Sequence, residues 1–95
     1  MTSLIIPVAK FRIGRILSTP HALESLTQEG ILLGIQRHQA GDWGDLSDED
    51  RAANDRALVE GSRILSAYRA ANGTKFWIIT EADRSATTVL LPEDY

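Results

Sequence analysis

Apolar and polar residues alternate, with some interruptions, over residues 11–17. Phe11, Ile13 and Leu17 share one parity, and Arg12 lies on the other. Alternation with a period of two is typical of a strand that is buried on one side. We therefore expect a strand over this range, at the start of the folded domain.

Two short helices are predicted after this strand. Thr19 can cap a helix, and Pro20 suits the first helical position because its missing N–H would have no partner there. Gly30 is expected to end this first helix. A second helix is expected over residues 31–39, with Gly41 as the residue that terminates it.

The third predicted helix has the strongest signals. Ser47 can cap it, and Asp50, three residues later, completes an acidic form of the capping box. The acidic first turn is also favoured by the helix dipole. Apolar residues then follow at helical spacing as far as Gly61, where we expect the helix to end.

The last third of the chain predicts an antiparallel meander. Runs rich in β-branched and aromatic residues, separated by turn sequences, indicate strands over residues 64–69, 75–80 and 87–91. Between the first two of them, Asn72 and Gly73 predict a two-residue hairpin loop of type I′.

Together these elements predict an α+β fold. Short helices should pack on one face of a three- to four-stranded antiparallel sheet that ends in a C-terminal β-meander. The helix-covered face should carry Phe76, Ile78 and either Val89 or the pair Thr88 and Leu90, because side chains alternate between the two faces of a strand.

Length and composition restrict the class of protein. Ninety-five residues are enough for one domain, expected over residues 11–95, behind an N-terminal arm of residues 1–10. The apolar run near the start of the arm is too short for a membrane span or a signal peptide. The chain has no cysteine, which excludes a disulfide framework or a thiolate metal site and suits the cytoplasm.

Charge is distributed unevenly. The net charge is −3, and residues 42–60 hold seven acidic residues against Arg51 and Arg56. Such a run is typical of a solvated helix face, and the alternative is an acidic patch that docks a basic partner or mimics nucleic acid. The acidic balance makes nucleic acid a less expected partner than protein, because nucleic-acid binding usually needs a basic face.

His38 is the main candidate for chemistry, because imidazole exchanges protons near neutral pH. At the end of the second helix, the dipole would favour its charged form, although it could simply cap the helix or bond the following turn. Asp42 and Asp45 flank Trp43 in that turn. These residues offer possible binding groups, but no recognised metal-ligand spacing is present, so we expect no metal and no cofactor.

Two further polar residues stand out. Asn54 shares a helix face with apolar residues and should be buried, clasping the backbone of the turn at residues 41–45 or contacting a substrate. Arg84, in the turn before the last strand, could bind phosphate or carboxylate bidentately, or pair with Glu81 and Asp83. If the protein were a nuclease, His38, Arg84 and Thr88 would be its catalytic residues.

Several segments resemble a family of short bacterial proteins that are labelled plasmid-related or hypothetical and occur near mobile elements. The resemblance runs from about residue 14 to 95 and is carried by His38–Asp45, Asn54, Leu65–Tyr68, Trp77–Ser85 and Thr87–Pro92. It implies a bacterial, mobile-element context, and it implies no reaction.

Two functions follow as hypotheses. The first is a small non-enzymatic interaction or accessory protein of a mobile element, which binds a host or defence protein. The second is a metal-independent ribonuclease of the barnase or RelE type, suggested by the order of helices and meander alone. A homodimer is possible under either hypothesis. Weak catalytic signals and acidic charge favour the first.

Overall fold

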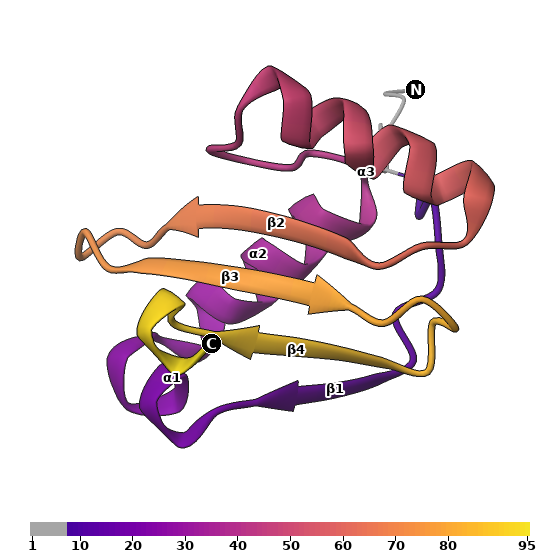
Figure 1. Ribbon diagram of the computed structural model, residues 1–95. Helices are drawn as coiled ribbons and strands as arrows, with labels where there is room; N and C mark the ends of the chain where they lie inside the picture. Colours follow the sequence, from indigo (N-terminus) through magenta and orange to yellow (C-terminus); the bar gives the residue numbers. More distant parts are fainter. Residues whose placement is uncertain (1–7) are drawn as a thin grey trace, which may run out of the picture.

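The structure, a computed structural model, describes residues 8–95. Most of the predicted arm, residues 1–7, lies outside the described residues. The elements follow the order β1 (Arg15–Ser18), α1 (Pro20–Ser25), α2 (Gln28–Gln39), α3 (Asp48–Glu60), β2 (Ile64–Arg69), β3 (Lys75–Thr80), β4 (Ala86–Leu90) and the 3₁₀ turn η1 (Pro92–Asp94) (Figure 1).

The strands form one four-stranded sheet in the order β1-β4-β3-β2. The meander β2-β3-β4 is antiparallel, as predicted, and the α+β class is confirmed. The sheet is mixed rather than wholly antiparallel, because β1 pairs with β4 in parallel. The chain between these two strands includes three helices and two strands, which is ample for a parallel connection.

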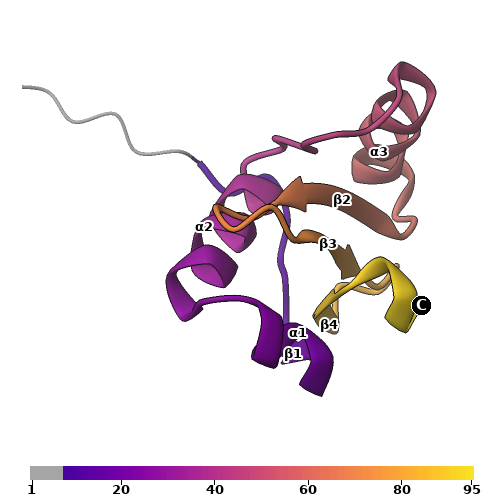
Figure 2. The ribbon, with the colours of Figure 1, turned by 90° about the vertical axis from the view of Figure 1, so that its left-hand side faces the viewer.

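Helices α1 and α2 cover one face of the sheet, and η1 lies on the other (Figure 2). Phe76, Ile78 and Val89 are buried on the helix-covered face, which confirms the first of the two predicted sets. The main core joins this face to Ala22, Leu26, Ile35, Tyr68 and Leu91.

A second, smaller core lies beside α3. Trp43, Ala57 and Ile64 are buried there, and Phe11 and Leu46 pack against them. Because Phe11 belongs to this second core, the predicted strand over residues 11–17 is too long. Only Arg15–Ser18 forms a strand.

The boundary between α1 and α2 also differs from the prediction. Leu26, which enters the core, is the C-cap of α1, and Thr27 starts α2 by accepting the Gly30 N–H on its side chain. Gly30 therefore lies in the first turn of α2 and does not end α1. Other predicted caps hold: the Thr19 and Ser47 side chains cap α1 and α3, and α3 ends at Gly61 in the left-handed conformation.

The β2–β3 loop is not the predicted two-residue type I′ turn. The Gly73 N–H donates to Ala70 O and the Ala70 N–H donates to Thr74 O, so three residues separate the closing pair. Gly73 has φ +87°, whereas Asn72 is not in the left-handed region. A type I turn followed by a left-handed glycine is the usual three-residue hairpin.

Across residues 8–95, no helix has the length and apolarity needed to cross a membrane.

Candidate functional site

His38 lies in the last turn of α2 and points into the sheet, where it has 0% exposure. Its Nδ1 lies 2.5 Å from Ser66 Oγ on β2, and its Nε2 lies 2.8 Å from Thr80 Oγ1 on β3. Thr80 Oγ1 lies 2.7 Å from Thr87 Oγ1 on β4. The prediction that His38 caps the helix or bonds the following turn is therefore wrong.

The end of this chain of hydroxyls fixes the direction of every hydrogen bond in it. Thr87 donates its proton to Ile13 O, at 2.7 Å, so it can only accept from Thr80. Thr80 then has no proton left for His38, and it accepts from Nε2–H. In the neutral imidazole, which burial of His38 favours, Nδ1 carries no proton and accepts from the Ser66 hydroxyl. Every donor of this neutral hydrogen-bond network then has an acceptor.

Burial opposes the charged form of this histidine. It lowers the pKa of His38 from 6.5 to about 4, and the positive charge of Arg84 adds to the effect. The expectation that the helix dipole would favour the imidazolium is wrong, because the dipole effect is smaller than the cost of burying a charge. At neutral pH, His38 is a structural group that ties α2 to three strands.

Asp42 and its neighbours form a tight turn that extends the sheet past β2. Trp43 O accepts from Ala67 N–H at 3.1 Å, and Asp45 N–H donates to Ala67 O at 2.7 Å. Trp43 is buried, and its indole N–H donates to Asp55. The segment thus occupies the outer edge of β2.

The Asp42 carboxylate accepts from Arg37 at 2.7 and 3.2 Å, and this bond lowers the pKa of Asp42. Its backbone carbonyl accepts the Tyr68 hydroxyl at 2.6 Å, and the Arg37 guanidinium stacks on the Tyr68 ring at 4.6 Å. Both polar ends of Asp42 are therefore engaged within the protein.

Asn54 is 5% exposed, as expected, but its partner differs from the one predicted. Its amide donates to Leu65 O at 2.7 Å and accepts from Leu65 N–H at 3.3 Å. The side chain does not bond the turn at residues 41–45. It bonds the outward-facing backbone groups of Leu65, which is the next outward-facing residue of β2 before Ala67. Asn54 and the turn together cover this edge of the sheet at Leu65 and Ala67, a device that hinders pairing with other chains.

Arg84 binds backbone rather than an anion. Its guanidinium donates to Ser62 O at 2.6 Å, Ala57 O at 3.0 Å and Glu81 O at 3.1 Å, which ties the end of α3 to the β3–β4 turn. The expected ion pairs with Glu81 and Asp83 do not form: Asp83 accepts from Ser85 N–H, and Glu81 lies 3.8 Å from Arg63.

His38, Arg84 and Thr88 do not converge. The ring of Phe11 lies 5.1 Å from the His38 ring and 5.7 Å from the Arg84 guanidinium. Thr88 pairs with Ile79 and faces the sheet surface opposite to the helices, because its neighbour Thr87 faces His38. No group of three metal-ligating side chains occurs among the described residues.

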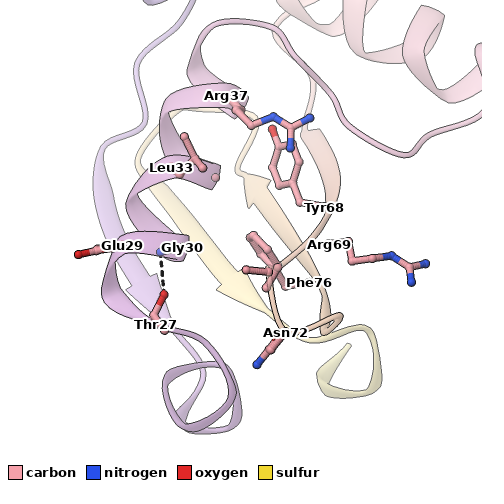
Figure 3. Close-up of a pocket in the computed structure, with 12 residues that line it drawn as sticks. Thr27, Glu29, Gly30, Leu33, Arg37, Tyr68, Arg69, Asn72 and Phe76 are labelled. Atoms are coloured by element: carbon pink, nitrogen blue, oxygen red, sulfur yellow. Dashed lines mark hydrogen bonds between the residues drawn. The ribbon is translucent and has the colours of Figure 1, made fainter.

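One surface cavity lies beneath the β2–β3 hairpin. It holds about 350 Å³ and is lined by apolar groups of Leu33 and Phe76 and by the stacked pair Arg37–Tyr68 (Figure 3). Arg69 points away from it in this view. Because Arg37 is already paired with Asp42, the cavity offers an anionic ligand little charge.

A larger groove of about 530 Å³ runs beside β1, between that strand and helices α1 and α2. Four exposed apolar residues line it: Ile16, Leu17, Leu23 and Leu32. These residues were not expected from the sequence to form a binding surface. Two signals were present, the adjacent Ile16-Leu17 pair and the continuous apolar run of residues 31–33, because a helix or strand buried on one side leaves such a run partly exposed.

Among the residues that the structure describes, none covers the outer edge of strand β1. The Arg15 and Thr19 N–H groups donate to Ser85 O and Val89 O, so the odd-numbered residues face β4. By alternation, the N–H and C=O groups of Ile16 and Ser18 face outward. Within residues 8–95, no strand pairs with this side of β1. The apolar groove and the open strand edge form one continuous surface, which we call the β1 edge.

No protein-family model, curated protein or solved structure matches the chain.

Proposed function

We propose that the protein is a non-enzymatic interaction module that binds a protein strand along the β1 edge. In the mobile-element context that the resemblance implies, it would act as an accessory protein and present the assembled module to a host or defence protein. The lack of cysteine is consistent with a cytoplasmic location.

The observation that carries this proposal is the difference between the two edges of the sheet. Within the described residues, Asn54 and the Trp43–Asp45 segment satisfy the outward groups of Leu65 and Ala67 in β2, whereas neither Ile16 nor Ser18 of β1 has such cover. Open edges are a liability that folded proteins normally block with charge, proline or covering segments. Here Ile16 is 51% exposed and Leu32 is 52% exposed on the same surface. Strand addition combines main-chain hydrogen bonds with pockets for alternate side chains, and the β1 edge offers both.

The candidate catalytic groups support a binding role by their placement. His38 is enclosed, and Arg84 donates to backbone carbonyls. A general base must lie within hydrogen-bond reach of its substrate, and an enclosed imidazole has no such access. Purified protein is therefore expected to leave RNA intact. Cleavage that His38→Gln abolishes in a variant that remains folded would support the ribonuclease instead.

Site-specific photo-crosslinking in bacterial cells tests the binding surface. A photoreactive residue at Leu32 should give protein adducts, and the same residue at Val59 should not. Val59 is 88% exposed on α3, away from the β1 edge, and serves as the matched control. Adding Ile16→Lys should abolish the adducts at position 32, because it places a charge on the edge. Equal adducts at both positions, or adducts that persist with Ile16→Lys, would contradict the proposal.

A further inference from the structure

The length of the open edge restricts what can pair with it. Gly14, just before β1, has φ +60° and lies so close to Ser85 that a Cβ there would come within 2.3 Å of Ser85 O. Pro20, just after β1, has no N–H to donate. Only Ile16 and Ser18 therefore offer strand-like backbone groups, and the fitting partner is an equally short strand.

We propose that this partner is the β1 strand of a second copy of the chain, which pairs antiparallel to form a symmetric dimer with a continuous eight-stranded sheet. The inference rests on the proposed function and names the strand that the β1 edge accepts. A second copy brings the same short strand with the same outward groups, so neither partner leaves a backbone group unpaired beyond the contact.

One register satisfies both strands. If Leu17 faces Leu17 of the second copy, then Ile16 faces Ser18 on each side, and each of these two pairs exchanges two hydrogen bonds. A register centred on Ile16 would require Gly14 to pair, and one centred on Ser18 would require an N–H from Pro20. The central Leu17 pair is then a non-hydrogen-bonded pair, whose Cα atoms lie about 4.5 Å apart.

The side chains fit this arrangement. Leu17 pairs with Thr88 and so lies on the face opposite to the helices, where it would meet its symmetry mate. Ile16 pairs with Thr87 and lies on the helix-covered face, beside the groove lined by Leu32. Because the two-fold axis would pass through the sheet, the grooves of both copies lie on the same side and together exclude water from these exposed apolar groups.

Charge supports the same choice of partner. Arg15, at one end of β1, would face Thr19 of the second copy. The Thr19 hydroxyl donates to the Asp94 carboxylate at 2.7 Å, on the face that Arg15 also occupies. Each end of the contact would therefore set a guanidinium near a carboxylate. Opposite charges at both ends favour the antiparallel arrangement, because a parallel pairing would set Arg15 beside Arg15.

Cysteine crosslinking tests the dimer and its register, because the chain has no cysteine of its own. Leu17→Cys places two thiols at the symmetric pair, with a Cα separation in the range that a disulfide spans. Mild oxidation should convert this full-length variant to a covalent dimer. Val59→Cys is the exposed control, and Ser18→Cys tests the register because Ser18 would face Ile16. Sedimentation of the cysteine-free protein over a dilution series should show a dimer that dissociates on dilution, and Leu17→Arg should sediment as a monomer with an unchanged circular dichroism spectrum.

The outcomes separate this inference from the function on which it rests. Rapid oxidation of Leu17→Cys, with slow oxidation of both other variants, supports the dimer. Oxidation of Ser18→Cys as fast as that of Leu17→Cys would refute the register. A monomer at every concentration, with adducts to a foreign protein at Leu32, would overturn the dimer and leave the proposed function standing. A monomer with no adducts would remove both.

Discussion

Acid should destabilise this protein through His38 well above the pH at which carboxylates titrate. The folded state holds the imidazole neutral with a pKa of about 4, whereas the unfolded chain gives it a pKa of 6.5. Between these two values the unfolded state binds more protons, so stability falls as the pH falls. The loss begins near pH 6.5 and is complete below about pH 4.

The difference of about 2.5 pKa units corresponds to roughly 3 kcal/mol at 1.36 kcal/mol per unit, of which about 2 kcal/mol is already lost at pH 5. That is a large part of the 5–15 kcal/mol that typically holds a small domain folded. Full burial leaves no solvent screening to reduce it, since the His38 side chain is enclosed.

Urea denaturation at a series of pH values measures this loss directly. The free energy of unfolding should fall by about 2 kcal/mol between pH 7 and pH 5 in the natural protein. His38→Gln should be less stable at pH 7, because Ser66 or Thr80 is left without its partner, but nearly flat over the same range. His21→Gln, at the other histidine, is the matched control: it leaves His38 and its partners in place, so the fall in stability between pH 7 and pH 5 should persist. A His38→Gln slope equal to that of the natural protein would refute the reasoning.

Four further substitutions test the contacts around α3 and the outer edge of β2. Asn54→Ala should lower the free energy of unfolding by about 1–3 kcal/mol in urea titrations, because Leu65 loses both partners; an unchanged midpoint would show that the clasp contributes nothing. Arg84→Met should cost about 1.5–3 kcal/mol and speed amide exchange at the end of α3, because charge-assisted bonds to Ala57 and Ser62 are lost; unaltered exchange would contradict that role. Gly61→Ala should cost about 1 kcal/mol through its positive φ, whereas Gly44→Ala, with nearly the same φ, should cost far more because a Cβ would overlap Ala67 O; equal melting temperatures for the two variants would contradict the close approach.

Local signals in the sequence predicted local structure well. Thr19 with Pro20, Ser47 and Gly61 mark helix ends by short-range chemistry, and the structure confirms them. The prediction that Gly30 ends α1 was wrong, because glycine is also tolerated in the first turn of a helix. The nearby Thr27, which caps α2, was the competing signal. The Asn72-Gly73 pair predicted a hairpin correctly, but the length of its loop depends on which residues pair across β2 and β3.

Long-range contacts could not be predicted in this way. The burial of Asn54 could be predicted from the helix face that it shares with apolar residues. Its partner, Leu65, could not, because that contact depends on how α3 packs against the edge of β2. The site of His38 depends on three strands that bring Ser66, Thr80 and Thr87 to one place. The parallel pairing of β1 with β4, which creates the open edge, has no signature in either strand alone.

Amide hydrogen exchange at β1 tests the central claim most directly. The Leu17 N–H faces β4 and should be protected under all conditions, whereas those of Ile16 and Ser18 face outward and should exchange fast in dilute protein. Exchange at Ile16 and Ser18 should slow strongly once the protein associates, while exchange at Leu17 should stay as it was. Association that leaves the exchange of Ile16 and Ser18 unchanged would show that the β1 edge is not the binding element.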